Sequence, residues 1–433
     1  ELMLIDTYEE SSLAQILHQR PGAEVAPGDR LIHQPHHEDY SLEHLGALAP
    51  DEADRNCLLS LPRFLTAWRR RCQKEEAFCL ALCRVRQENV PHSREVDAEN
   101  GYLRQLLDTL EQKLPSQGLA GSYGSACFIL YLPGTGPEEA RELLHSLPSP
   151  EAEGNSYVFR GGIGYYPCLN YTRLDVAETA RNALEHAELL SGNAVTVFDS
   201  LSLTVSADRH YARGDLAEAI TDYQQALLLD PDNHLARNSL AICHAHLGRN
   251  SRAQQEFQDL LARDPAHVIA LYNQACLSLK TEQLEEAEEN LQRCLELQPE
   301  QHFCLIRLGQ IRERKGDLQG ARDYYQRANH TPQGPRYAYK HLARLDHLHG
   351  DLRAARDNLQ KAVQANPWDA EALHLMARIY LETGEDPELV ESLAKRSYSL
   401  RPDLEEHLRL LEKILISRGK EEEARHLRLG AEE

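Results

Sequence analysis

Apolar positions in the second half of the chain recur with a step of 34 residues. Small alanines carry the step, and an aromatic residue or a leucine follows each of them four residues later. The alanines are Ala219, Ala253, Ala287, Ala321 and Ala355, and their followers are Tyr223, Phe257, Leu291, Tyr325 and Leu359. Prolines repeat on the same step at Pro231, Pro265, Pro299 and Pro367. A period of this length indicates stacked copies of one supersecondary unit.

Each unit predicts a pair of helices. In residues 234–267, Gly248 ends the first helix, and Ala253 and Phe257 line the second. Pro265 cannot continue a helix, so it ends the unit. One such pair cannot bury its own apolar face, whereas stacked pairs can. The order of a small residue, an aromatic four residues later and a final proline resembles the tetratricopeptide repeat (TPR).

This resemblance covers residues 200–433, as about six repeats followed by C-terminal cap helices. It implies an all-α superhelix whose first helices line a concave groove that binds a protein or peptide. By the geometry of the family, the groove side chains include Asn238, Tyr272, Phe303, Ile306, Tyr337, Lys340, Arg344 and Arg378. An apolar floor that passes into a basic end suits an extended or helical peptide with an acidic terminus.

The pattern between residues 51 and 199 alternates helix and strand. Short apolar runs predict strands at Phe78–Val85, Cys127–Leu132, Tyr157–Tyr166 and Ala194–Phe198. Helical spacing is found over Leu61–Gln73, Asp97–Leu114, Pro137–Leu147 and Val176–Leu190. This alternation predicts an α/β or α+β sandwich domain. Residues 1–50 form an N-terminal segment or linker of unknown fold, with a short helical signal at Ser11–His18.

The same region resembles the diguanylate cyclase domain, which is named GGDEF after its signature. Ser122–Leu144 resembles the signature hairpin, and Asp54–Trp68 resembles the opening of the domain. Phe159–Tyr166 and Ala180–Val195 resemble its late strand and its closing helix and turn. The resemblance implies a GGDEF-like, nucleotide-cyclase-type α+β sandwich over residues 51–199.

The catalytic residues of that family are absent. Its two divalent cations need carboxylate ligands, but Arg84 stands where the first strand should supply an acid. The signature is degenerate as well, and its positions are occupied by Gly124, Ser125, Ala126 and Cys127. Pro115–Gly118 replace the feedback site that binds the product. The resemblance therefore implies a domain that is not an enzyme, with no metal, cofactor or catalytic residue.

Two function classes remain open. One is a bacterial-type signalling or scaffold protein, in which the repeats bind a partner and the degenerate domain is a platform or dimerisation unit. The other is a nucleotide receptor that binds GTP or cyclic di-GMP without turnover. Arg84 and Arg86 favour the second class, because arginine suits phosphate. The loss of every recognisable nucleotide-specific residue favours the first.

Composition narrows the classes of partner and the cellular compartment that we expect. The formal net charge of −21 argues against nucleic acid as a partner. The chain has no apolar run near the length that spans a membrane. Its ten cysteines include no CxxC pair, which predicts buried free thiols in a reducing, cytoplasmic compartment. His33, His36, His37 and His44 are interpreted as a polar loop rather than a zinc site. The chain begins at Glu1, which is compatible with a piece of a longer protein that carries an upstream sensor or anchor.

Overall fold

The structure is a computed structural model that describes residues 2–8, 11–16, 58–87, 106, 108–110, 112–124, 127–147 and 157–432. Its contacts divide the chain into two compact units, His36–Arg263 and Asp264–Glu433, the latter grouped with Glu1–Pro35. The sequence predicts a domain boundary at 199/200 instead, between the sheet and the repeats. Among the described residues, no helix has both the length and the apolar character needed to cross a bilayer.

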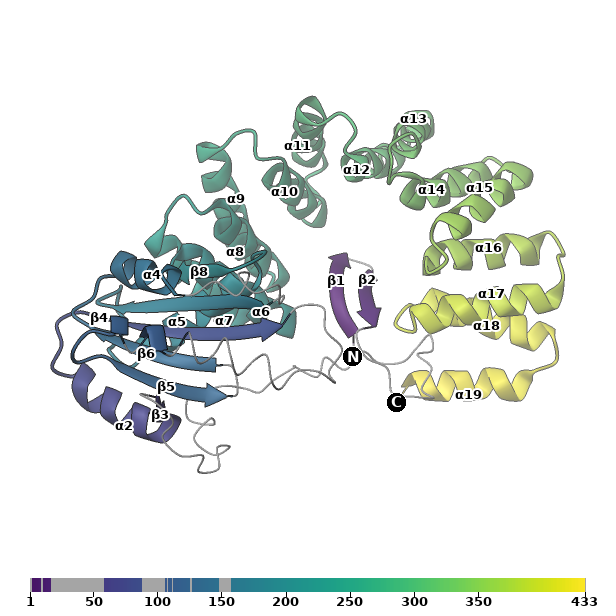
Figure 1. Ribbon diagram of the computed structural model, residues 1–433. Coiled ribbons are helices and arrows are strands. Elements are labelled where there is room, and N and C mark those ends of the chain that lie inside the picture. Colours follow the sequence, from purple (N-terminus) through teal and green to yellow (C-terminus); the bar gives the residue numbers. More distant parts are fainter. Residues whose placement is uncertain are drawn as a thin grey trace. The chain divides into compact units, whose positions relative to one another are not determined.

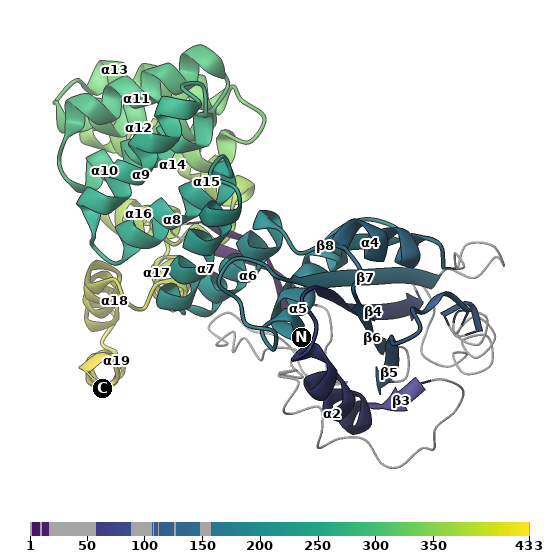
Figure 2. The ribbon, with the colours of Figure 1, turned by 90° about the vertical axis from the view of Figure 1, so that its left-hand side faces the viewer.

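A six-stranded mixed sheet forms the start of the first unit. Its strands are β3 (Leu58–Ser60), β4 (Phe78–Gln87), β5 (Leu119–Gly124), β6 (Cys127–Pro133), β7 (Tyr157–Tyr166) and β8 (Ala194–Val197). The order across the sheet is β3-β5-β6-β4-β7-β8, and Figure 2 shows β4 between β6 and β7. The strand β4 is antiparallel to both of these neighbours, whereas the β3–β5 and β7–β8 pairs are parallel.

Helices cover both faces of this sheet. They are α2 (Leu61–Cys72), α4 (Pro137–His145) and α5 (Val176–Glu188). The apolar side chains of α2 and α5 belong to one core cluster with Phe78 and Leu80. Those of α4 belong to the opposite cluster with Cys79 and Ala81. Successive residues of β4 thus point to opposite faces, both of which are covered, which is why Phe78–Cys83 form an unbroken apolar run.

Glycines bring α5 directly onto β7. A Cβ added at Gly162 would lie 2.0 Å from the backbone nitrogen of Leu184. One added at Gly164 would lie 2.5 Å from the carbonyl oxygen of Val176. Larger residues would therefore push the helix off the strand. This close packing is the physical reason for the glycine-rich run within β7.

The first repeats belong to the same unit as the sheet. They contain α6 (Ser200–Arg213), α7 (Leu216–Leu229), α8 (His234–His246) and α9 (Asn250–Arg263). Phe198, which follows β8, is buried in one core with Leu203 of α6 and Tyr223 of α7. Asn233 joins the first two repeats, because its Nδ2 donates to Ser200 Oγ at 2.6 Å. Apolar packing therefore fixes the first repeat to the end of β8, and the buried amide fixes the second repeat to the first.

The second unit consists of five further helix pairs (Figure 1). Their helices are α10 (Val268–Lys280), α11 (Leu284–Leu297), α12 (His302–Arg314), α13 (Leu318–Asn329), α14 (Pro335–Leu348), α15 (Leu352–Ala365), α16 (Ala370–Glu382), α17 (Pro387–Leu400), α18 (Glu405–Ser417) and α19 (Glu421–Glu432). The alanines on the 34-residue step are fully buried where the two helices of a pair cross. Gly309 serves the same purpose, since a Cβ there would lie 2.4 Å from the ring of Tyr325.

The turn inside each pair repeats as well. A glycine with positive φ ends the first helix at Gly214, Gly248, Gly316, Gly350, Gly384 and Gly419. The turn after α10 has Glu282 at the equivalent place, with a φ of 62°. All but the last of these turns follow the 34-residue step. Only glycine adopts this backbone region without strain, so Glu282 is the exception in the series.

Most predicted elements in the described residues are confirmed, within a few residues at their ends. Two strands of the sheet, β3 and β5, were not predicted. The helix expected over Ser11–His18 is wrong, because Ser11–Ile16 form a strand (β2) antiparallel to Leu2–Tyr8 (β1). The histidine cluster from His33 to His44 lies outside the described residues. The described cysteines form no disulfide, and most of them are buried.

Candidate functional site

Aromatic side chains from three successive first helices form a continuous row in the second unit. The ring centroids of Tyr272 on α10 and Phe303 on α12 are 6.2 Å apart. Phe303 is 5.5 Å from Tyr337 on α14, and His302 stacks on Tyr337 at the same distance. Tyr272, Phe303 and Tyr337 are half-buried, whereas His302 is buried. We call these four residues the aromatic row.

The aromatic row is held by polar contacts at one end. The Tyr272 hydroxyl is hydrogen-bonded to Arg307 and Cys276, and burial raises the pKa of this phenol. Arg307 also donates from Nη1 to Gln310 Oε1 at 3.2 Å. Burial lowers the pKa of His302, which favours the neutral ring that stacks on Tyr337. The row is therefore a set of neutral rings beside a guanidinium.

The basic end predicted from sequence is largely neutralised within the chain. Lys340 Nζ lies 3.3 Å from Asp369 and 2.9 Å from Glu371. Arg344 Nη2 lies 2.5 Å from Glu313. Because these acids stand on the neighbouring repeats, the cations join one repeat to the next. Sequence reasoning missed the pairs, although Glu313–Arg344 and Lys340–Glu371 both have a separation of 31 residues, close to one repeat.

The remaining groove residues differ in how much surface they offer. Ile306 is only 8 % exposed and belongs to a core cluster with Tyr325, so it gives a partner little to contact. Arg378 of α16 is half-buried and, among the described residues, forms no ion pair. Its Nε is buried without a hydrogen-bond partner. Asn238 lies on α8 in the other unit and is half-buried.

A second candidate region is the end of β4 in the sheet. Arg84 forms an ion pair with Glu188, at the last turn of α5. The guanidinium is also hydrogen-bonded to Cys127, which begins β6. Neighbouring Tyr123 places its hydroxyl 3.5 Å from the carbonyl oxygen of Cys83, and burial raises the pKa of Tyr123. Ser125 and Ala126 lie outside the described residues, and Gly124 ends β5.

The Arg84–Glu188 pair decides what this region can do chemically. The carboxylate that Arg84 contacts is already neutralised, and the arginine is a cation where a metal would need an anion. Sequence reasoning identified Arg84 but not Glu188, which lies 104 residues away and is brought to the strand by α5.

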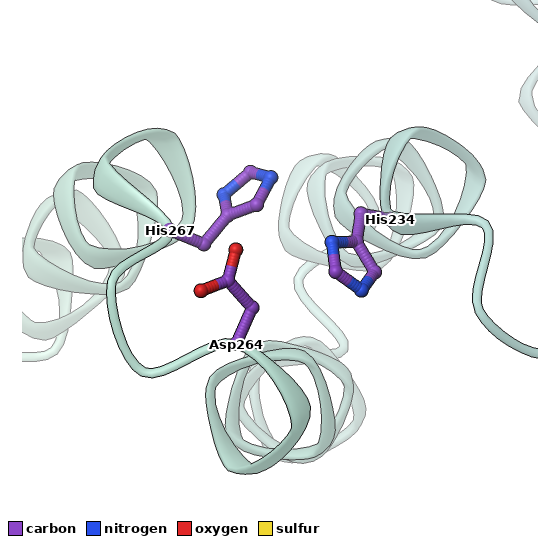
Figure 3. A group of neighbouring side chains, drawn as sticks. All are labelled: His234, Asp264 and His267. Atoms are coloured by element: carbon purple, nitrogen blue, oxygen red, sulfur yellow. The ribbon is translucent and has the colours of Figure 1, made fainter.

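Figure 3 draws a group of three possible metal ligands, His234, Asp264 and His267. Asp264 and His267 flank the turn before α10, and both already accept hydrogen bonds from its backbone. Asp264 Oδ1 accepts from the backbone nitrogen of Ala266 at 3.1 Å, and His267 Nδ1 accepts from that of Ala270 at 3.1 Å. His234 belongs to the other compact unit. Two ligands within one unit do not make a metal site.

Comparisons with known proteins bear on the repeats. The family model for the middle TPR-like domain of cilia and flagella-associated protein 70 matches residues 203–304. The model for the fifth ARM-repeat domain of TT21 matches residues 272–381. Neither match reaches the mixed sheet. A comparison with curated proteins finds no match. Together with the 34-residue step and the helix pairs, these matches show that this is a TPR-like repeat protein.

Several solved structures are similar over about half of the chain. The type IV pilus biogenesis factor PilW is 24 % identical, with a TM-score of 0.42, and 50 % of this chain and 98 % of that one are covered. Pseudomonas aeruginosa PilF is 20 % identical, with a TM-score of 0.43, and the coverage is 49 % and 97 %. The APC/C hetero-tetramer Cut9–Hcn1 is 18 % identical at a TM-score of 0.43, with 50 % and only 43 % covered.

Proposed function

We propose that this chain is a non-catalytic scaffold whose TPR-like repeats bind a protein or peptide through the first helices of the second unit. TPR-type repeat proteins commonly mediate protein–protein interaction or scaffolding. The observation that carries the proposal is the aromatic row, because its half-buried rings form a continuous apolar surface across three repeats. Aromatic side chains are enriched among the residues that dominate binding energy at interfaces.

The ion pairs of Lys340 and Arg344 refine the partner expected from sequence. An acidic peptide terminus would compete with Asp369, Glu371 and Glu313 for these cations. Exchanging one carboxylate for another gains little free energy. The rings of the aromatic row therefore supply most of the affinity for a partner with an apolar or aromatic side chain, and Arg378 remains the cation for an acidic group.

Capture of partners from the native cell lysate tests this proposal. The double variant Phe303→Ala/Tyr337→Ala should weaken capture at least about tenfold, or about 1.4 kcal/mol. Leu348→Ala is the matched control, since Leu348 is 64 % exposed at the end of α14 and lies outside the row. Reversal of Arg344 and Arg378 to glutamate should have a smaller effect. If the aromatic variant, shown folded by circular dichroism, retains every partner, the row is not the binding site.

For the sheet domain, we propose the degenerate GGDEF-like fold, serving as a platform or dimerisation unit. The β5–β6 hairpin at the predicted signature and the packing of Phe198 against α6 and α7 support this role. The Arg84–Glu188 pair argues against catalysis and against the nucleotide-receptor alternative, because Glu188 is held by a cation and Arg84 is already paired with a carboxylate rather than open to a phosphate. Incubation with GTP and magnesium should give no cyclic dinucleotide. Neither GTP nor cyclic di-GMP should raise the melting temperature, and a dose-dependent rise would restore the receptor alternative.

A further inference from the structure

Two histidines stack on each other between the last repeats of the second unit. The rings of His374 on α16 and His407 on α18 lie 4.5 Å apart and are nearly parallel, with an interplanar angle of 18°. His407 is 1 % exposed, and its Nδ1 lies 2.7 Å from Ser397 Oγ of α17. One nitrogen of each ring, His374 Nδ1 and His407 Nε2, is buried without a hydrogen-bond partner.

We propose that this stacked pair makes the attachment of the C-terminal helices α18 and α19 sensitive to mild acidification. A protonated imidazole donates from both ring nitrogens. Each ring has one buried nitrogen that meets no acceptor, so protonation leaves a buried donor unsatisfied. Two imidazolium rings at this separation also repel each other. Detachment of α18 exposes both rings to water and removes both penalties.

The charged groups around the pair come from three places. From α16 they are Glu371, which is held by Lys340, and Arg378. From α18 the exposed Glu406 faces His374. From the turn before α18, Asp403 faces His407 but is paired with Arg401. On α17, the residue in contact with His407 is Ser397, which is neutral. The two carboxylates near His374 favour its protonation, but burial, His407 and Arg378 oppose them.

Burial, followed by the neighbouring His407, lowers the pKa of His374 from 6.5 to about 4. A detached α18 would let His374 take up a proton near pH 6.5, whereas the attached state resists it down to about pH 4. Attachment is therefore strongest above pH 6.5 and weakens as the pH falls through this window.

Two other contacts hold α18 and α19 independently of the histidines. Leu411 and Ile414 of α18 pack in the apolar core of the last repeats. Glu391 of α17 pairs with Arg418 and Lys420 across the α17–α18 junction. These cations, with Lys395, lower the pKa of Glu391 to about 2. The ion pairs of Glu391 thus persist at pH 5 and do not contribute to the acid sensitivity that we assign to the histidine pair.

Hydrogen exchange of the full chain at pH 7 and pH 5 tests the proposal. Protection factors of α18 amides, corrected for the chemical exchange rate, should fall about tenfold in the wild type. Helix α11 contains no histidine and serves as the internal reference. In His374→Gln the fall should be less than about threefold. His347→Gln is the matched control, because half-buried His347 pairs with Glu382 of α16 and should leave the α18 response unchanged.

An equal fall in the wild type and in His374→Gln overturns the proposal, as does α18 protection that stays constant in the wild type. Histidine ring titration by NMR of the wild type keeps the test valid if the variant does not fold. His374 should titrate more than one pH unit below 6.5 in the folded protein. Titration at 6.5 or above would show that the stack does not resist protonation.

Discussion

Replacing Glu282 by glycine should stabilise the second unit. Glu282 ends α10 with a φ of 62°, in the left-handed region that every other turn of this kind fills with glycine. The turn has the same hydrogen bond as its neighbours. The nitrogen of Gln283 donates to Ser278 O at 2.8 Å, as that of Asp317 donates to Arg312 O at 2.9 Å. The backbone thus adopts the glycine conformation in spite of its side chain.

The expected gain follows from two opposing terms. The left-handed conformation costs a residue with a Cβ about 1–2 kcal/mol. Glycine also makes the unfolded chain more flexible. This lowers the free energy of the unfolded state by about 0.4–1 kcal/mol and offsets part of the gain. Glu282 is exposed, and no contact of its side chain enters the balance. The free energy of unfolding should therefore rise by about 0.5–1 kcal/mol in Glu282→Gly.

Urea unfolding followed by circular dichroism measures this difference. For a slope of about 2 kcal/mol per M, the midpoint should rise by about 0.3–0.5 M. Glu282→Ala keeps the Cβ and should leave the midpoint almost unchanged. Gly316→Glu is the mirror substitution, and it should lower the midpoint although a Cβ there meets nothing within 4 Å. A midpoint for Glu282→Gly at or below that of the wild type would refute the reasoning.

Three further substitutions test other contacts. Gly162→Ala should lose about 2–3 kcal/mol of stability, because its Cβ would collide with the backbone of Leu184. Gly136→Ala, whose nearest atom is 3.9 Å away, should lose at most about 1 kcal/mol in the same thermal unfolding, because only the N-cap of α4 is weakened. Asn233→Ala should lose about 2 kcal/mol with the N-cap of α8 and two buried hydrogen bonds. Asn233→Asp keeps the cap but should lose at least as much in urea, because its buried carboxylate would face the Ser200 and Thr204 hydroxyls, which already donate elsewhere. The pKa of Glu391 is lowered to about 2, so its stabilising effect should be complete above pH 4.5 and fade as the pH falls towards 2. The urea midpoints of the wild type and Glu391→Gln should therefore converge at low pH. A difference that stays constant with pH would contradict this.

The sequence predicted the elements whose side-chain pattern is local. The 34-residue step predicted the helix pairs, because the residues where two helices cross must be small in every copy. Largely apolar runs predicted β4, β6 and β7, since these strands are covered on both faces. The short strand β3 and the strand β5, LAGSYG, carry no such run and were missed. They are strands because β5 and β6, respectively, offer them backbone partners.

The candidate sites depended more on tertiary structure. Sequence alone singled out Arg84 and the first-helix positions of a predicted groove, because each is defined by its place in a repeated or recognised pattern. Partners from other elements decided which of these side chains remain available to a ligand. Glu188 pairs with Arg84, and Glu313 pairs with Arg344. The contact between His374 and His407 likewise exists only because α16 and α18 pack together. A local pattern determines which face of a helix is apolar, but pairing of charges and stacking of rings depend on distances that only the folded chain sets.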